Sequence, residues 1–273
     1  MEEKVIQTSG FHTTYIETGT PGKTPLVLVH DGAFGASGAV SWGRFIPLVE
    51  GEYHVFAPDL LGWGGSDKAV FFDRAPYAPR VAQLQSFCEQ LGIRDAIFMG
   101  VSFGASVLLR WATSAVSPPP AQAIIAINGT GGPMRKPEGL EALGSFDPPS
   151  MGRLRDLCLW LLDDHEGLEQ HLEERFEAAM VPGQWESMMA VRVRNPEAPP
   201  VPVDTFFDDL SRVTAPVVYV EGTRDKMLEP GWSEVLKNHT PGSTSVTMNS
   251  SHEPNIDNPE LLLEVFRTLV NKK

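Results

Sequence analysis

The segment GVSFG, residues 100–104, places Ser102 between two glycines. An apolar run precedes it, and a helix-like stretch, ASVLLRWATS, follows it directly. A serine on a sharp strand-to-helix turn can expose its hydroxyl as a nucleophile, and the glycines let neighbouring backbone approach closely. The alternative is a serine that only caps a helix. A nucleophile also requires a base and a group that orients the base, so the rest of the chain decides between the two.

Two further residues could supply those groups. Asp225 follows the apolar run VVYVEG, and His252 stands between the last such run and a C-terminal helix-like segment. His252 would accept the proton of Ser102, and Asp225 would orient the imidazole and stabilise its charged form. An ordinary imidazole pKa near ~6.5 suits this exchange at neutral pH. Each residue alone could be a solvated surface group, but the three together predict a catalytic triad.

The loop after residues 25–30, PLVLVH, is built from small residues whose N–H groups could stabilise an oxyanion. We expect the N–H of Phe103 and one from Gly32 or Ala33 to form this site, and such a donor contributes roughly 10²–10³ in rate. His30 is expected to be a structural hydrogen-bonding residue and not a base. The other histidines lack metal-ligand spacing, so neither a metal nor a cofactor is predicted.

These residues must be positioned by a sheet. Short apolar runs rich in Val and Ile, bounded by Gly, Pro or Asp, are typical of strands buried on both faces. Helix-length segments such as residues 78–92, which ends at Gly92, lie between several of them. This alternation predicts an α/β fold with a mostly parallel, twisted sheet flanked by helices. Residues 4–18 are expected to form an antiparallel start.

The alternation stops between Gly131 and Val213. Proline- and glycine-rich stretches there flank residues 151–180, whose apolar positions have helical spacing. We predict a helical cap at residues 131–213, inserted into a core domain of residues 1–130 and 214–273. A second independent domain is the alternative. Aromatic residues of this segment could line a pocket or pack in the core: Trp160, Phe176 and Trp185.

Composition excludes some partners. The chain of 273 residues has a formal net charge of −13, and such a field repels nucleic acid and anionic membranes. No apolar stretch approaches the roughly 20 residues of a membrane helix, and the N-terminal segment lacks the apolar region of a signal peptide. We expect a cytoplasmic protein with a small-molecule substrate, with Cys88 and Cys158 as buried thiols. The sequence does not predict the number of subunits, and a homo-oligomer is compatible with it.

Together these residues resemble the α/β-hydrolase fold over nearly the whole chain. The order Ser, Asp, His is the order expected of that fold, and residues 57–68, APDLLGWGGSDK, are similar to the segment after its fourth strand. A serine nucleophile at position 102 weighs against two branches of this fold. Dehalogenases and epoxide hydrolases of the same fold use an aspartate at the position of Ser102.

A narrower resemblance is to the meta-cleavage-product hydrolases, which cut carbon–carbon bonds in vinylogous 1,5-diketones from aromatic-ring degradation. Residues 30–42 are similar to their glycine-rich loop, and residues 126–132 to their entry into the cap. Residues 174–183, ERFEAAMVPG, resemble a cap segment whose arginine faces the substrate carboxylate.

The resemblance therefore implies that Arg175 binds a substrate carboxylate, for which its planar guanidinium is suited. The alternative is a solvated helix charge paired with a nearby Glu or Asp. Arg192 and Arg194 are further candidates for the carboxylate, and Trp185 is a candidate wall of the same pocket.

The chain also departs from that family. Val101 replaces an asparagine before the nucleophile, and Glu253 replaces a tryptophan after the catalytic histidine. In the glycine-rich loop the substitutions are Asp31, Ala33 and Phe34. Loss of a buried asparagine removes polar groups that could hold an enolate or ketone oxygen. These changes are compatible with acyl transfer to water and weigh against the carbon–carbon substrate.

We expect a cofactor-independent serine hydrolase that acts on a small carbonyl compound. Carbon–carbon hydrolysis of a vinylogous diketone is one interpretation, and carboxylesterase, lactonase or thioesterase action is the other. A lyase, an acyltransferase or a ligand receptor built on the same fold is a third, because a triad does not require hydrolysis.

Overall fold

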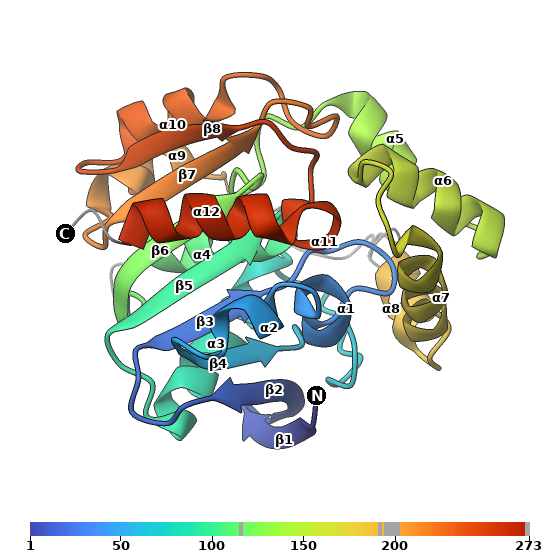
Figure 1. The fold of residues 1–273 in the computed structure, drawn as a ribbon, viewed down its shortest axis with the longest axis horizontal. Helices are drawn as coiled ribbons and strands as arrows, with labels where there is room; N and C mark the ends of the chain where they lie inside the picture. Colours follow the sequence, from blue (N-terminus) through green and yellow to red (C-terminus); the bar gives the residue numbers. More distant parts are fainter. Residues whose placement is uncertain (115–116, 191–192, 194–202, 271–273) are drawn as a thin grey trace.

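The computed structural model describes residues 1–114, 117–190, 193 and 203–270. Its eight-stranded sheet has the order β1-β2-β4-β3-β5-β6-β7-β8 (Figure 1). The strands are β1 (Glu3–Thr8), β2 (Phe11–Gly19), β3 (Pro25–Val29), β4 (His54–Pro58), β5 (Ala96–Val101), β6 (Ala121–Ile127), β7 (Val217–Gly222) and β8 (Thr244–Met248).

The strands from β3 to β8 pair in parallel, whereas β1 with β2 and β2 with β4 pair antiparallel. The antiparallel start predicted for residues 4–18 is therefore confirmed. Strand β5 is buried along its whole length, as expected of a parallel strand covered on both faces by helices. The predicted α/β class is confirmed as well.

Helices cover both faces of the sheet. Side chains of α1, α2 and α12 pack in one buried cluster, and side chains of α3, α4 and α10 pack in the other. Helix α3 ends where the sequence predicts, because Gly92 adopts the left-handed conformation that closes a helix. The helices are α1 (Gly38–Trp42), α2 (Ile46–Val49), α3 (Tyr77–Leu91), α4 (Phe103–Ala112), α5 (Pro137–Gly144), α6 (Met151–Leu161), α7 (Leu168–Ala179), α8 (Gln184–Ala190), α9 (Phe206–Asp209), α10 (Trp232–His239), α11 (Pro254–Asp257) and α12 (Pro259–Val270), with a 3₁₀ helix at Leu210–Arg212.

The chain between β6 and β7 holds α5 to α9 and contributes no strand to the sheet in its described part. Helices α5 to α8 lie together beyond one end of the sheet (Figure 1). The sequence predicts its cap in this segment, which we call the cap segment (residues 131–213). The two thiols are buried and unpaired, as predicted, and burial raises the pKa of Cys88 and of Cys158 to about 12.

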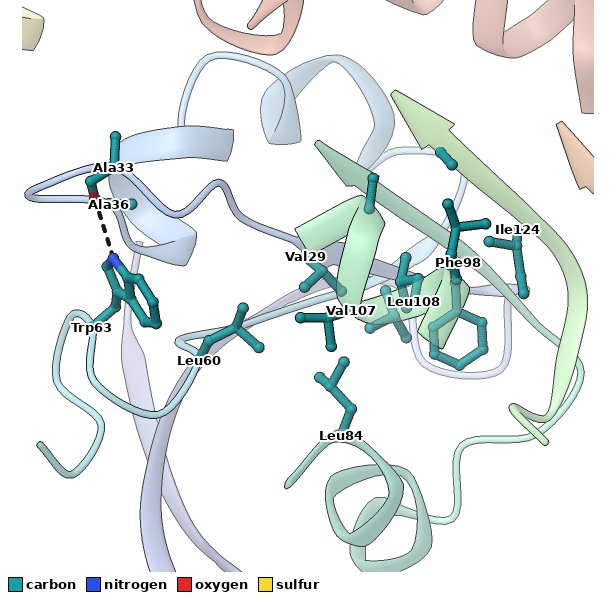
Figure 2. Packing of buried hydrophobic residues seen from close by; sticks show 14 of the residues in the cluster. Val29, Ala33, Ala36, Leu60, Trp63, Leu84, Phe98, Val107, Leu108 and Ile124 are labelled. Carbon is teal, nitrogen blue, oxygen red and sulfur yellow. Dashed lines mark hydrogen bonds between the residues drawn. The ribbon is translucent and has the colours of Figure 1, made fainter. Parts of the chain in front are cut away.

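Helix α4 packs directly on the sheet. Figure 2 shows Val107 and Leu108 of this helix among Val29, Phe98 and other buried side chains. At the start of the helix the contact is with backbone, since a Cβ on Gly104 would lie 2.3 Å from the carbonyl oxygen of Val29. Only glycine fits there, and the second glycine of the serine motif therefore has a packing role.

We expect Gly104→Ala to destabilise the fold by about 1–3 kcal/mol, because the added methyl group forces α4 away from β3. Gly152→Ala is the matched control: no atom would lie within 4 Å of its Cβ, and alanine is the better helix former. Urea unfolding of the two variants measures the difference. Equal stability of both variants would contradict the close approach.

Candidate active site

The strand order brings the predicted site residues to one edge of the sheet. The chain runs outward from β3 to β4 on one side and then returns to β5 on the other, and ligands of α/β proteins bind at such a reversal. Val29 pairs with Gly100, so the loop after β3 emerges beside Ser102. Strands β7 and β8 end at the same edge, ahead of Asp225 and His252.

Ser102 occupies a strained turn between β5 and α4. Its φ is 54° and its ψ is −115°, a conformation that few residues other than glycine adopt. The side chain makes no capping hydrogen bond, which removes the helix-cap alternative. The Oγ atom instead lies 2.8 Å from Nε2 of His252.

The imidazole of His252 connects Ser102 to Asp225. Its Nδ1 lies 2.8 Å from Oδ2 of Asp225, and the ring is 2% exposed. Burial lowers the pKa of His252, but the charge and hydrogen bond of Asp225 outweigh burial, and the pKa stands above its ordinary value. The three side chains can pass a proton from serine to histidine, as general-base activation requires.

Asn128, which directly follows β6, binds the backbone beside His252 and at the end of β7, ahead of Asp225. Its side-chain amide donates to the carbonyl oxygens of Ser251 and His252, at 3.0 and 2.9 Å, and its Oδ1 accepts from the N–H of Gly222. Sequence reasoning missed this role. The available signal was an asparagine before a glycine at a strand end, which is typical of a residue with positive φ, and the φ of Asn128 is 45°.

The backbone positions of two of the three proposed oxyanion donors are compatible with that role. Phe103 is the first residue of α4, where the helix has no carbonyl to accept its N–H. Gly32 lies against it so closely that a Cβ would be 2.6 Å from Cβ of Phe103. Ala33 is different, because its N–H donates to Oδ1 of Asp31 at 2.8 Å. The Ala33 prediction is corrected on this ground, and Gly32 is the donor that the loop can offer.

His30 has the structural position expected from the sequence. Its Nε2 accepts from the N–H of Leu60 at 2.8 Å, and its Nδ1 lies 2.6 Å from the carbonyl oxygen of Asp31. Burial lowers the pKa of His30 to about 4, so the ring is neutral at physiological pH.

A cavity of about 870 Å³ opens over Ser102 and His252, and Gly32 and Phe103 are among the residues that line it. A volume of this size accommodates a small organic substrate. The cap segment contributes part of the wall through Leu143, Leu161, Ser187, Met188 and Val193.

Arg175 does not line this cavity. It is fully buried, and its Nη2 and Nη1 atoms lie 2.5 Å from Oδ1 of Asp31 and 3.2 Å from Oε2 of Glu253. Its Nε donates to the carbonyl oxygen of Phe34. The predicted carboxylate-binding role of Arg175 is corrected. The arginine is paired with acidic side chains, as in the alternative, but it is buried and not solvated.

We call Arg175, Asp31 and Glu253 the buried ion cluster. Burial raises the pKa of Asp31, but Arg175 and a hydrogen bond from Ser41 outweigh burial and hold this pKa below its ordinary value. Burial and the charge of Asp31 raise the pKa of Glu253 to about 7. Arg175 therefore favours the ionised form of Asp31, whereas burial and the charge of Asp31 favour the protonated form of Glu253.

Trp185 also lies outside the cavity lining. It packs against the larger buried cluster, and its indole Nε1 is buried without a hydrogen-bond partner in the described structure. The proposed pocket role of Trp185 is corrected to packing. The further candidates Arg192 and Arg194 lie outside the described residues.

The model of the family described as "Alpha/beta hydrolase family" matches residues 26–265. The chain belongs to this family. The predicted fold is thus supported by sequence as well as by topology.

Two curated relatives are similar to this alpha/beta hydrolase. The 2-hydroxy-6-oxononadienedioate/2-hydroxy-6-oxononatrienedioate hydrolase of Klebsiella pneumoniae is 29% identical over 225 residues, which cover 76% of this chain and 73% of that one. Epoxide hydrolase A of Mycobacterium tuberculosis is 32% identical over 107 residues, and the match covers 39% of this chain and only 32% of that protein.

Among solved structures, the meta-cleavage product hydrolase CumD of Pseudomonas fluorescens superposes on this alpha/beta hydrolase with a TM-score of 0.78. The identity is 22%, over 97% of this chain and 98% of that one. The names of this structure and of the Klebsiella relative confirm the resemblance to the meta-cleavage-product hydrolases.

Within the described part of this alpha/beta hydrolase, no helix is long and apolar enough to span a membrane. The same residues contain no group of three His, Cys, Asp or Glu side chains that could hold a metal ion.

We expect Arg175→Met to destabilise the protein by about 3–5 kcal/mol, because the buried carboxyl groups of Asp31 and Glu253 lose the guanidinium that pairs with both. Thermal and urea unfolding measure the loss. Arg155→Met is the control, since Arg155 pairs with Glu169 on the exposed surface, where ion pairs contribute little. A stable Arg175→Met protein with weakened substrate binding would restore the carboxylate-binding interpretation.

Proposed function

We propose that this protein is a serine hydrolase in which Ser102 is the nucleophile, His252 the general base and acid, and Asp225 the group that orients His252. The observation that carries the proposal is the chain of two 2.8 Å contacts from Ser102 through His252 to Asp225, with Ser102 and His252 in the wall of the cavity. The N–H groups of Phe103 and Gly32 would stabilise the oxyanion.

For the substrate, we propose a vinylogous diketone of the meta-cleavage type, cut at a carbon–carbon bond. The Klebsiella relative, which is named as a hydrolase of 2-hydroxy-6-oxononadienedioate, supports this choice. His252 would first help to move a proton from the enol hydroxyl to the carbon that will leave. Ser102 would then pass its proton to His252 and attack the ketone carbonyl. When the carbon–carbon bond breaks, its electron pair would leave with the enolate, to which His252 would return the proton, and water activated by His252 would release the acid from the acyl enzyme and restore Ser102.

A second candidate is hydrolysis of an ester, lactone or thioester. The burial of Arg175 favours it, because the cap arginine that the resemblance assigns to the dienoate carboxylate has no access to the cavity. Val101 is also fully buried and supplies no polar group beside Ser102. Ester hydrolysis uses the same triad and needs no proton shift before attack.

A paired absorbance assay distinguishes the two functions. We expect the protein to bleach a yellow meta-cleavage dienoate and also to hydrolyse a short p-nitrophenyl ester, with both activities lost in Ser102→Ala by about 10³-fold or more. Ester turnover without bleaching would favour the second candidate. No turnover of either substrate, despite covalent labelling of Ser102 by a fluorophosphonate, would contradict hydrolysis.

The pH dependence of kcat/KM tests the role of His252. Only the neutral imidazole can accept the serine proton, so activity should rise with pH through an apparent pKa above 6.5. In Asp225→Asn the charge that raises this pKa is lost. The acid limb should therefore shift to lower pH while the rate at its plateau falls. If the acid limb of the kcat/KM profile is at the same pH in Asp225→Asn as in wild type, a group other than His252 governs that limb.

A further inference from the structure

The wall of the cavity contains an arginine that the proposed triad does not use. Arg80, on α3, lines the cavity and is 7% exposed. None of the ion pairs among the described residues includes it, whereas buried Arg175 has two carboxylate partners. Burial without a nearby carboxylate lowers the pKa of Arg80 to about 10, so the guanidinium is still charged at neutral pH.

The contacts of Arg80 fix its orientation without neutralising its charge. Its Nε and Nη2 donate to the carbonyl oxygen of Leu61 at 3.0 and 2.8 Å, and its Nη1 donates to that of Pro76 at 2.9 Å. The guanidinium also lies over the ring of Trp63, 5.3 Å from its centroid. A planar cation held in this way loses little further conformational entropy when it binds a ligand.

Donors remain for such a ligand. A guanidinium has five N–H groups, and the three contacts above leave one on each terminal nitrogen. Nη2 lies 3.2 Å from the point that a Cβ of Gly62 would occupy, and Oγ of Ser187 is 4.0 Å from the same point. Gly62 and Ser187 both line the cavity, so this edge of Arg80 lies where core and cap segment meet around the substrate space.

The other arginines of the lining are less suited. Arg74 is exposed and paired with Asp73, and Arg135 donates to Oη of Tyr77 and is only half-buried. An exposed cation is screened by water and salt, whereas a desolvated one forms strong charge-assisted bonds.

We propose that Arg80 is the specificity-determining residue of the cavity and binds the carboxylate of an anionic acyl substrate. Two free N–H groups match the two oxygens of a carboxylate, and the anion compensates a charge that the described chain leaves unpaired. This inference rests on the proposed function, because it places the anion in the cavity that contains Ser102.

The test compares two substrates within each protein preparation: the mono-p-nitrophenyl ester of adipic acid and the same ester with its free carboxylate methylated. We expect wild type to prefer the charged ester, and Arg80→Gln to reduce the ratio of the two kcat/KM values by about 10- to 100-fold. The ratio does not depend on the fraction of folded enzyme. Arg80→Lys should retain part of the preference.

Arg74→Gln is the matched control, since it removes a cation from the same cavity, and we expect the ratio to change by less than about twofold. A wild-type ratio of one or less overturns the proposal, whether or not Arg80→Gln folds. An unchanged ratio in Arg80→Gln overturns it as well, and a loss confined to Arg135→Gln would assign the anion to Arg135.

A second readout needs no turnover. Hexanoate should protect Ser102 from fluorophosphonate labelling more strongly than hexanamide does in wild type, and equally in Arg80→Gln. If Ser102 is not labelled at all, the proposed serine hydrolase function fails. If Ser102 is labelled and hexanoate gives no greater protection than hexanamide, only the role of Arg80 fails.

Discussion

The buried ion cluster of Arg175, Asp31 and Glu253 joins the three segments on which the site depends. Arg175 belongs to α7 of the cap segment, Asp31 precedes the proposed oxyanion donor Gly32, and Glu253 follows the proposed base His252. Removing such charges from water is expensive, and the loss is recovered only when all partners are present with good geometry. Helix α7, the loop after β3 and the loop that carries His252 are therefore held in one arrangement by one guanidinium.

The buried ion cluster also decides which of two buried arginines can act on a ligand in the cavity. Because Arg175 is compensated inside the protein, it offers no charge to the substrate space. Arg80 is compensated by dipoles alone, from the carbonyl groups of Leu61 and Pro76 and the face of Trp63. A carbonyl dipole stabilises a cation less than a carboxylate does, so the electrostatic field of Arg80 extends into the cavity. Two arginines of similar burial thus have opposite consequences for ligand binding.

Local pattern predicted the strands, the end of α3 at Gly92 and the antiparallel start, because hydrophobic runs and glycine signals act within a few residues. The approach of Ser102, Asp225 and His252 was also predictable, since each follows a strand and parallel strands end at one edge. The partners of Arg175 and the contacts of Asn128 were not predictable, because each depends on a residue distant in sequence and a single sequence does not show which distant residues meet. The N–H of Ala33 is different, since its acceptor Asp31 is only two residues away and an aspartate that accepts from the N–H two residues on is a local turn pattern.

The cluster has a consequence for how such an enzyme could change over evolutionary time. A cap inserted between two adjacent parallel strands can be exchanged without altering the register of either strand, and new substrate ranges could arise by that route. Here the exchange is epistatic. A new cap that lacked Arg175 would leave two buried acidic side chains of the core, Asp31 and Glu253, without the guanidinium that pairs with them. These two residues would therefore have to be replaced before the cap or together with it. The charge of Arg175, which does not line the cavity, thus restricts the order in which substitutions are tolerated.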